Sequence, residues 1–254
     1  MDDDTALTET RRKFLGYVLS GAVAATVLMV YGPGASARAR RGDHGAAHEF
    51  AYVIDVNKCI GCGNCVRACK RENAVPAGVF RTWVERYIVT NQGVYVDSPE
   101  GALQGFKAVN EEIRKDTKFS LTVPKMCNHC LNPPCVQVCP VGATFRSDEG
   151  FVLVDHEHCL GCAYCVQACP YGARFINPVR EKSDKCTWCY HRVKAGKLPA
   201  CVTVCPNKAR LFGDLKDPES EVTQVFEEDK WLVLKPAMYT DPYCFYVGLP
   251  REVI

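Results

Sequence analysis

Short runs of apolar and β-branched residues, separated by turns and polar loops, are the main pattern along this chain. Five of these runs predict β-strands, at residues 52–56, 80–89, 93–97, 152–156 and 230–236. The run at 80–89 alternates between polar and apolar positions, and the turn at 91–93 allows it to pair with the run that follows. The chain is therefore expected to build small sheets from short strands.

The segments between and after these strands are polar or aromatic. Residues 111–118 are charged and are predicted to be exposed, and residues 212–218 predict a turn. The cysteine-free stretch 70–126 either covers buried groups or docks a partner. Residues 237–254 form an aromatic-rich tail, which either wraps around the body or crosses to a neighbour. Cys244 in this tail is expected to be a small buried apolar residue.

The N-terminal part differs in composition from the rest. Two arginines at positions 11 and 12 precede an uncharged stretch at 14–37, which ends in a small-residue cleavage site. This pattern predicts a twin-arginine export signal. The stretch of 24 residues is also long enough to span a membrane. Residues 1–37 are thus either a cleaved signal or a retained membrane anchor, and residues 38–48 are predicted to be a flexible linker.

Sixteen of the seventeen cysteines fall into four tight groups, and this grouping predicts that the protein binds a cofactor. The groups are, in order, Cys59, Cys62, Cys65 and Cys69; Cys127, Cys130, Cys135 and Cys139; Cys159, Cys162, Cys165 and Cys169; and Cys186, Cys189, Cys201 and Cys205. The first and third have the spacing C-x2-C-x2-C-x3-C, by which bacterial ferredoxins hold [4Fe–4S] clusters. The four groups therefore predict four [4Fe–4S] clusters and a role in electron transfer.

Zinc and disulfide bonds are the alternatives for these cysteines. Structural zinc sites usually combine two well-separated pairs of ligands, whereas the first and third groups are denser than that. An odd total of seventeen and such short loops do not suit four sets of disulfides. The sequence contains no C-x-x-C-H motif, so no c-type haem attachment is predicted.

Other residues in and around the groups are assigned supporting roles. The histidines are expected to donate or accept hydrogen bonds around the clusters rather than bind iron; they are His129, His156, His158 and His191. The aromatic residues are expected to shield the clusters from water; they are Tyr164, Tyr171, Trp188 and Tyr190.

The motifs are internally repeated, which predicts the fold class. Residues 59–69 recur as 159–169 with seven of eleven positions identical, and 135–140 resembles 201–206. Each repeat follows a predicted strand. We therefore expect an α+β fold of duplicated bacterial-ferredoxin-like two-cluster units, with an inserted β segment and an N-terminal signal or anchor helix. The iron–sulfur body should comprise residues 49–254.

Charge and motif content narrow the possible functions. The net charge is +2 and no extended basic run occurs, so nucleic-acid binding has no electrostatic support. The chain has neither a dinucleotide fingerprint nor a P-loop, and each cysteine group is complete. A catalytic iron–sulfur enzyme is therefore the less favoured alternative to an electron-transfer protein.

Three segments carry a resemblance to a known family. They contain C-N-H-C-L-N-P-P-C from Cys127, C-A-Y-C-V-Q-A-C-P-Y-G-A-R from Cys162 and D-K-C-T-W-C-Y-H-R from Asp184. In this order they resemble the four-cluster ferredoxin subunits of the DMSO reductase/polysulfide reductase type, which include subunits of formate-dependent nitrite reduction and tetrathionate reduction. The resemblance covers roughly residues 50–250.

The resemblance implies that the groups exchange their fourth cysteine. The implied ligand sets are Cys59, Cys62 and Cys65 with Cys205; Cys186, Cys189 and Cys201 with Cys69; Cys127, Cys130 and Cys135 with Cys169; and Cys159, Cys162 and Cys165 with Cys139. The first and fourth groups would then form one lobe, and the second and third groups the other. Some relatives replace a ligand and hold a [3Fe–4S] centre, but all sixteen positions are cysteine in this chain.

The resemblance also implies partners and a location. Family members sit between an integral-membrane quinone-interacting subunit and a redox partner, either a molybdopterin-type subunit or a multihaem cytochrome c. With a twin-arginine signal, which exports folded proteins, this chain is expected on the periplasmic side of the cytoplasmic membrane. It would be held there by its partners and, if residues 1–37 are retained, by its own helix. A free periplasmic polyferredoxin is the alternative.

Overall fold

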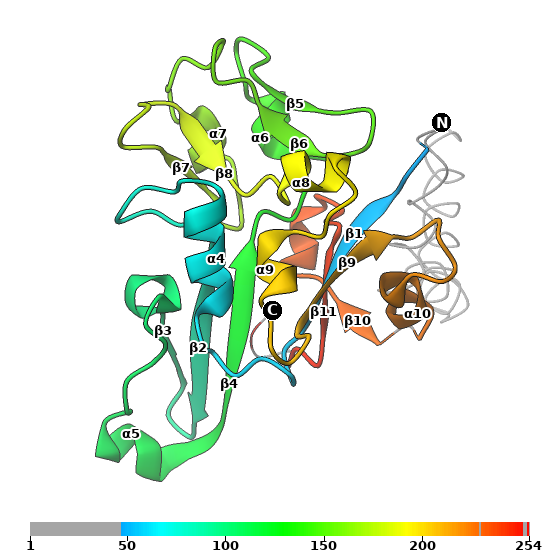
Figure 1. The fold of residues 1–254 in the computed structure, drawn as a ribbon. Coiled ribbons are helices and arrows are strands. Elements are labelled where there is room, and N and C mark those ends of the chain that lie inside the picture. Colours follow the sequence, from blue (N-terminus) through cyan, green and yellow to red (C-terminus); the bar gives the residue numbers. More distant parts are fainter. Residues whose placement is uncertain (1–46, 229, 251–252, 254) are drawn as a thin grey trace, which may run out of the picture. The chain divides into compact units, whose positions relative to one another are not determined.

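The computed structural model describes residues 47–228, 230–250 and 253, and these described residues form one compact unit. The predicted signal or anchor at 1–37 and most of the linker at 38–48 lie outside the described residues. Within the described ranges no helix is both long enough and apolar enough to cross a membrane. Short helices surround small sheets in this part of the chain (Figure 1).

The largest sheet joins the two ends of the described chain. Its order is β10-β11-β1-β9, with strands β1 (Phe50–Asp55), β9 (Arg210–Asp214), β10 (Trp231–Leu232) and β11 (Cys244–Val247). β1 pairs parallel with β11 and antiparallel with β9. Residues 51–54 are at most 1% exposed, so both faces of β1 are covered. The aromatic tail therefore wraps around the body, and Cys244 is fully buried as expected.

β9 and β10 correct two expectations. Residues 212–214 belong to β9 instead of forming a turn, because Phe212 pairs with Tyr52 of β1 and their rings lie 5.8 Å apart. The turn begins only at Leu215, before α10 (Glu221–Glu227). The strand expected at 230–236 is reduced to the two residues of β10, and η2 (Pro236–Met238) follows.

A second sheet, ordered β3-β2-β4, is built from the cysteine-free stretch. Its strands are β2 (Thr82–Thr90), β3 (Val94–Asp97) and β4 (Thr117–Met126), joined through η1 (Pro99–Ala102) and α5 (Glu111–Asp116). β2 and β3 pair antiparallel around the turn at 91–93. α5 contains no buried residue, and Figure 1 shows it at the end of this sheet that is far from α6 and α7.

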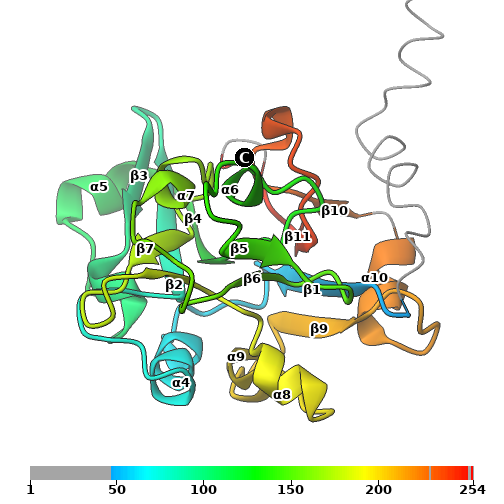
Figure 2. The same ribbon diagram turned by 90° about the horizontal axis from the view of Figure 1, so that it is seen from above.

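Two pairs of helices carry the cysteine loops. α4 (Asn64–Glu72) packs against α9 (Ala200–Thr203), and α6 (Pro134–Gln137) packs against α7 (Tyr164–Gln167). Both pairs lie side by side in Figures 1 and 2. The remaining elements are β5 (Thr144–Arg146), β6 (Val152–Val154), β7 (Arg174–Ile176), β8 (Ser183–Lys185) and α8 (Tyr190–Lys194). β5 pairs with β6 and β7 with β8. Elements of the first and fourth groups thus pack together, as do those of the second and third.

Candidate iron–sulfur centres

The loops of the first and third cysteine groups share one backbone turn. The residue before the helix has a left-handed conformation in both, with φ of 73° at Gly63 and 65° at Ala163. A Cβ on Gly63 would lie 2.1 Å from the carbonyl oxygen of Ala102, whereas Ala163 has room for its own. The same turn therefore presents the cysteines of both groups, and only the first group requires glycine for space.

Four cysteines from distant parts of the chain line one cavity. The first group contributes Cys59, Cys62 and Cys65, and Cys205 comes from the fourth group. A [4Fe–4S] cluster needs four thiolates around one compact body, so this lining fits such a cluster.

Cys69, the last cysteine of the first group, lies with the fourth group instead. Burial raises the pKa of the Cys69 thiol, and the nearby charges of Cys201 and Cys189 raise it further. Burial likewise raises the pKa of Cys186, with Cys69 as the strongest neighbouring charge. The four sulfurs are therefore neighbours where α4 packs against α9.

The second group shows the same exchange with the third. Burial raises the pKa of Cys130, and the charges of Cys127, Cys135 and Cys169 add to the rise. Burial also raises the pKa of Cys169, followed by the charge of Cys127. The last cysteine of the third group thus lies beside the sulfurs of the second group.

The contacts that would bring Cys159, Cys162, Cys165 and Cys139 together are fewer than those of the other three sets. Cys135 and Cys165 belong to one buried cluster with Val152, at the contact between α6 and α7. Cys139 follows α6 within that contact region, Cys159 is buried and Cys162 is exposed. The structure thus brings the second and third groups together, while the assignment of Cys139 to the sulfurs of the third group stays a prediction.

The cysteines that precede proline are held by backbone N–H groups. The amide of Thr144 donates to Sγ of Cys139 at 3.4 Å, and the amide of Ala209 donates to Sγ of Cys205 at 3.2 Å. At Cys139, burial raises the pKa, but the amides of Thr144, Val141 and Ala143 lower it by more. Because the turn at Cys139 stabilises a thiolate, it suits a cysteine that binds a metal cluster.

His129 supports the site through the backbone. Its Nδ1 accepts a hydrogen bond from the amide of Val152 at 3.1 Å, so the proton lies on Nε2, which donates to the carbonyl oxygen of Cys186 at 3.0 Å. Burial lowers the pKa of His129, with the charge of Lys185 as the next cause, and the ring is therefore neutral. The expected hydrogen-bonding role is the one observed.

Of the aromatic residues expected to shield the clusters, Trp188 is buried among the cysteine groups and Tyr164 lies at the surface. Trp188 is 2% exposed, stacks on His129 at 4.2 Å between ring centroids, and donates through Nε1 to the carbonyl oxygen of Cys127. Tyr164 is 58% exposed. Tyr171 and Tyr190 are partly buried.

Several residues near the sulfurs were missed from the sequence. Asn73 directs its amide to two cysteines, and Arg174 and Arg210 are buried beside others. The repeat C-P-x-x-A-R, which ends at both arginines, is a signal that could have revealed them. Asn73 has no comparable signal, because its contact to Cys189 depends on the fold.

Comparisons with known proteins also indicate [4Fe–4S] clusters. Two families, both described as "4Fe-4S dicluster domain", match residues 58–143 and 118–215. A tetrathionate reductase subunit of Salmonella typhimurium is 42% identical over 204 residues, which cover 80% of this chain and 73% of that protein. A polysulfide reductase polypeptide of Wolinella succinogenes is 37% identical over 206 residues, which cover 81% and 97%. Protein NrfC of Escherichia coli is 38% identical over 201 residues, which cover 78% and 80%.

Fold, sites and matches together define an iron–sulfur protein with duplicated ferredoxin-like dicluster units and mixed helix and strand content. Two dicluster domains correspond to four [4Fe–4S] clusters, as the cysteine groups predicted. The chain belongs to the family of iron–sulfur electron-transfer subunits of reductase complexes that includes these relatives. The resemblance noted in the sequence is thereby confirmed.

Proposed function

We propose that this chain is the non-catalytic electron-transfer subunit of a respiratory reductase complex, in which it connects an integral-membrane quinone-interacting subunit with a second redox partner. That partner is a molybdopterin-type subunit or a multihaem cytochrome c. When bound, the clusters supply one-electron redox chemistry. The chain's own residues hold the clusters, exclude water and donate hydrogen bonds to sulfur.

The order of the cysteine sets is the observation that carries this proposal. Burial raises the pKa of Cys201, which belongs to the set that contains Cys69, and Cys65 of the first set is among the neighbouring charges that raise it further. Burial also raises the pKa of Cys186, in the same set as Cys201, and the charge of Cys127 in the second group is among those that raise it further. Cys135 and Cys165 then lie in one buried cluster. These neighbour relations support a single row of four sites, with the first and third groups at its ends.

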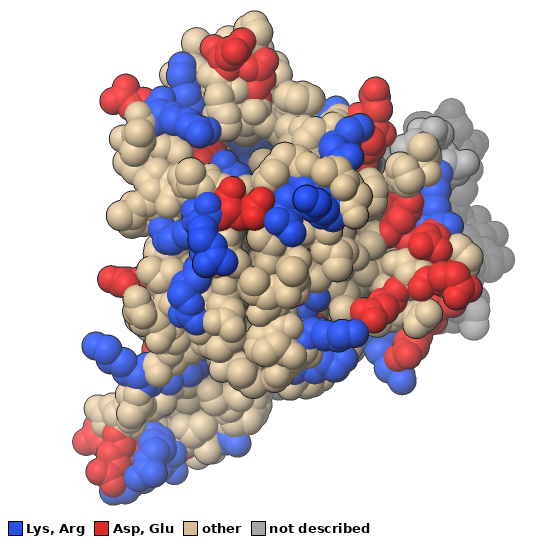
Figure 3. Space-filling view, viewed as in Figure 1, with Lys and Arg blue, Asp and Glu red and all other residues tan. Residues whose placement is uncertain are grey.

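The two ends of this row carry equivalent exposed apolar residues. Ile60 is 64% exposed and Leu160 is 65% exposed, and each follows the first cysteine of its group. Apolar side chains beside the terminal sites support protein contacts there. On the face drawn in Figure 3, basic and acidic side chains are interspersed, so no field of one sign favours a polyanion such as nucleic acid.

The assignment as non-catalytic rests on the cysteine count. Each proposed set supplies four thiolates, so every cluster can be fully ligated by protein with no position left for a substrate. The proposed location, the periplasmic side of the cytoplasmic membrane, rests on the twin-arginine pattern at the N-terminus.

The test is anaerobic isolation of the full chain from solubilised membranes of cells that also express its native partners. We expect co-purification with a multispanning subunit, about sixteen iron atoms per chain and bleaching of the visible absorbance by a reduced quinone analogue. A chain recovered alone from the soluble periplasmic fraction, with the same iron content, would identify a free polyferredoxin instead. Substrate turnover by the isolated chain would contradict its non-catalytic role.

A further inference from the structure

One arginine in each half of the molecule occupies an equivalent, buried place. Arg174 is the first residue of β7 and Arg210 is the first residue of β9. Each lies five positions after a cysteine, in the sequence C-P-x-x-A-R. Their exposed fractions are 4% and 1%. The duplication of the chain has therefore placed a guanidinium inside both halves.

Each arginine is bonded to the threonine that begins a strand after the partner group. Nη1 of Arg174 donates to Oγ1 of Thr144, the first residue of β5, at 3.1 Å. Nη2 of Arg210 donates to Oγ1 of Thr82, the first residue of β2, at 2.9 Å. The Arg174–Thr144 pair joins the third group to the second, and the Arg210–Thr82 pair joins the fourth group to the first. The same pairs of groups make up the two lobes.

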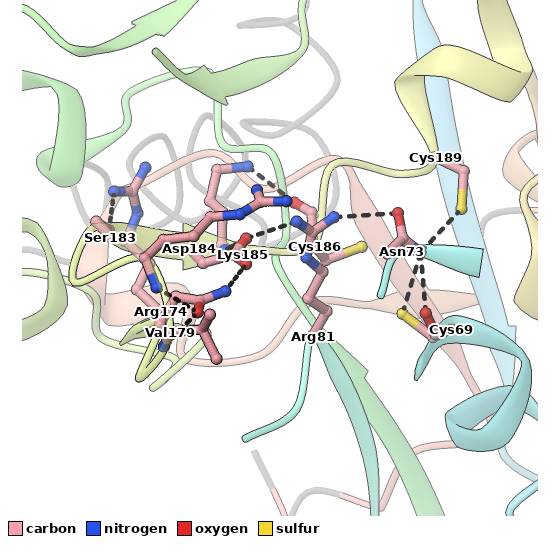
Figure 4. Close-up of polar contacts among 12 residues, drawn as sticks. Cys69, Asn73, Arg81, Arg174, Val179, Ser183, Asp184, Lys185, Cys186 and Cys189 are labelled. Atoms are coloured by element: carbon pink, nitrogen blue, oxygen red, sulfur yellow. Dashed lines mark hydrogen bonds and ion pairs between the residues drawn. The ribbon is translucent and has the colours of Figure 1, made fainter. Parts of the chain in front are cut away.

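Arg174 lies between the sulfurs of the second and third groups. Ser183 Oγ accepts a hydrogen bond from Nη1 of Arg174 at 3.3 Å (Figure 4). The same Oγ lies 3.1 Å from Sγ of Cys165. Burial lowers the pKa of Arg174, but the surrounding cysteines together, above all Cys135 and Cys165, raise it by more. Its Nε and Nη2 are buried and find no acceptor among the described residues. Buried N–H groups without an acceptor indicate a group that belongs beside them, and an anionic cluster fits.

Arg210 has the corresponding place between the first and fourth groups. It lines the cavity together with Cys65. Burial lowers the pKa of Arg210, while the charges of Cys65 and Cys201 are among the causes that raise it well above its usual value. Tyr52 lies with its hydroxyl 3.0 Å from Sγ of Cys201. Arg210 is therefore within electrostatic reach of both sets of sulfurs.

We propose that Arg174 and Arg210 are fixed cations between the two clusters of each lobe, and that each raises the reduction potentials of the two clusters it separates. A reduced cluster carries one more negative charge than an oxidised one, so a buried cation nearby favours reduction. A guanidinium remains charged at every physiological pH, so this effect is constant. The inference rests on the proposed cysteine sets.

The test is a redox titration of the full cluster-loaded chain, followed by EPR, in the wild type and five variants. These are Arg174→Met, Arg174→Lys, Arg210→Met, Arg210→Lys and the control Arg180→Met, which removes an exposed charge six positions from Arg174. At a fixed ambient potential, Arg174→Met should lower the reduced-to-oxidised ratio of two clusters at least about tenfold, which is about 59 mV for a one-electron couple. Arg210→Met should lower that of the other two. The lysine variants should retain most of the wild-type ratio, and the control should shift none.

Several outcomes would overturn this inference. They are unchanged ratios in the methionine variants, equal shifts of all four clusters, or lysine variants as shifted as the methionine ones. If a methionine variant loses iron, the lysine variant at the same position is compared with it. Full iron content in the lysine variant supports the need for a positive charge at that position, and an equal loss of iron contradicts the inference. Wild-type protein with other than four clusters would overturn the cysteine sets and this inference together, whereas four clusters with unshifted variants overturn the inference alone.

Discussion

The side-chain amide of Asn73 lies 3.8 Å from Sγ of Cys189, although 116 positions separate the two residues. The same Nδ2 lies 3.6 Å from Sγ of Cys69. Arg81 fixes this orientation, because its Nη1 donates to Oδ1 of Asn73 at 3.0 Å and leaves the NH₂ side facing the sulfurs (Figure 4). The Asn73 amide therefore contacts two cysteines that come from different cysteine groups but belong to the same proposed ligand set.

Replacement of Asn73 by leucine should lower the midpoint potential of one cluster. Hydrogen bonds to sulfur stabilise the more negative, reduced state. The loss of one bond of about 1 kcal/mol corresponds to about 40 mV. Asn73→Asp should lower the potential further, because it puts a negative charge beside the sulfurs. EPR-monitored titration measures both, and Asn91→Leu, which removes an amide in the exposed β2–β3 turn, is the control. Equal potentials in Asn73→Leu and the wild type would contradict this role.

The ion pair that supports Asn73 should be a large contributor to stability. Arg81 Nη2 lies 2.8 Å from Oδ1 of Asp184, and the two side chains are 8% and 3% exposed. Because either single change leaves a buried charge without its partner, Arg81→Met or Asp184→Leu should cost about 3–5 kcal/mol.

A double-mutant cycle measured by denaturant unfolding tests this pair. The double variant Arg81→Met/Asp184→Leu should lose about 1–3 kcal/mol less than the sum of the two single variants. Lys208→Met breaks a pair with Glu221 whose side chains are 74% and 60% exposed, and it should cost less than about 1 kcal/mol. Strict additivity in the cycle would show that Arg81 and Asp184 act independently.

The sequence predicts the cofactor because four ligands of one chemistry stand close together in it. The spacing of the first and third groups is local, and so are the strands at 52–56 and 80–89 that alternation and β-branching indicate. These features depend on neighbours within a few residues, which is what sequence patterns record.

The features that were missed depend on long-range packing. Residues 212–214 read as a turn because of Gly213 and Asp214, but pairing with β1 outweighs that local preference. Arg174 and Arg210 end the repeated motif C-P-x-x-A-R, which singles them out in the sequence, but their burial beside sulfur is visible only in the fold. The exchange of Cys69 and Cys205 between groups likewise came from a family resemblance rather than from spacing.

A partly exposed ion pair between Lys194 and Glu149 gives a prediction about pH. The ammonium group of Lys194, 2.7 Å from Glu149, is the main cause that lowers the pKa of Glu149 to about 2. A carboxyl group with a lowered folded-state pKa stabilises the protein fully above its ordinary value near 4.5, and this contribution is lost as the pH falls towards 2. Glu149→Gln should therefore lower the Tm by the same small amount, within about 4 °C, at every pH from 6 to 8. Thermal unfolding at low and high salt measures it, and a difference that grew between pH 6 and 8 would assign it to another group.

Two serine variants distinguish an exchanged ligand scheme from a local one. If Cys205 completes the set of Cys59, Cys62 and Cys65, Cys205→Ser should alter or remove the EPR signal of that cluster. Cys69→Ser should affect the cluster of Cys186, Cys189 and Cys201 instead, and the two variants should differ in which signal they lose. The cavity lined by Cys205 and the first group, and the influence of Cys201 and Cys189 on Cys69, are the basis of this expectation.

Reference variants and a control make the assignment of these signals independent of the scheme. Cys62→Ser and Cys189→Ser mark the clusters of the first and fourth groups, because each lies inside the loop of its own group. Cys244→Ser, at a buried cysteine of β11 outside the four groups, should leave all four signals in place. If Cys205→Ser removed the signal that Cys189→Ser marks, each group would keep its own last cysteine. The hydrogen bonds of Arg210 with Thr82 and of Arg174 with Thr144, which join the two cysteine groups of each lobe, would then need a different explanation.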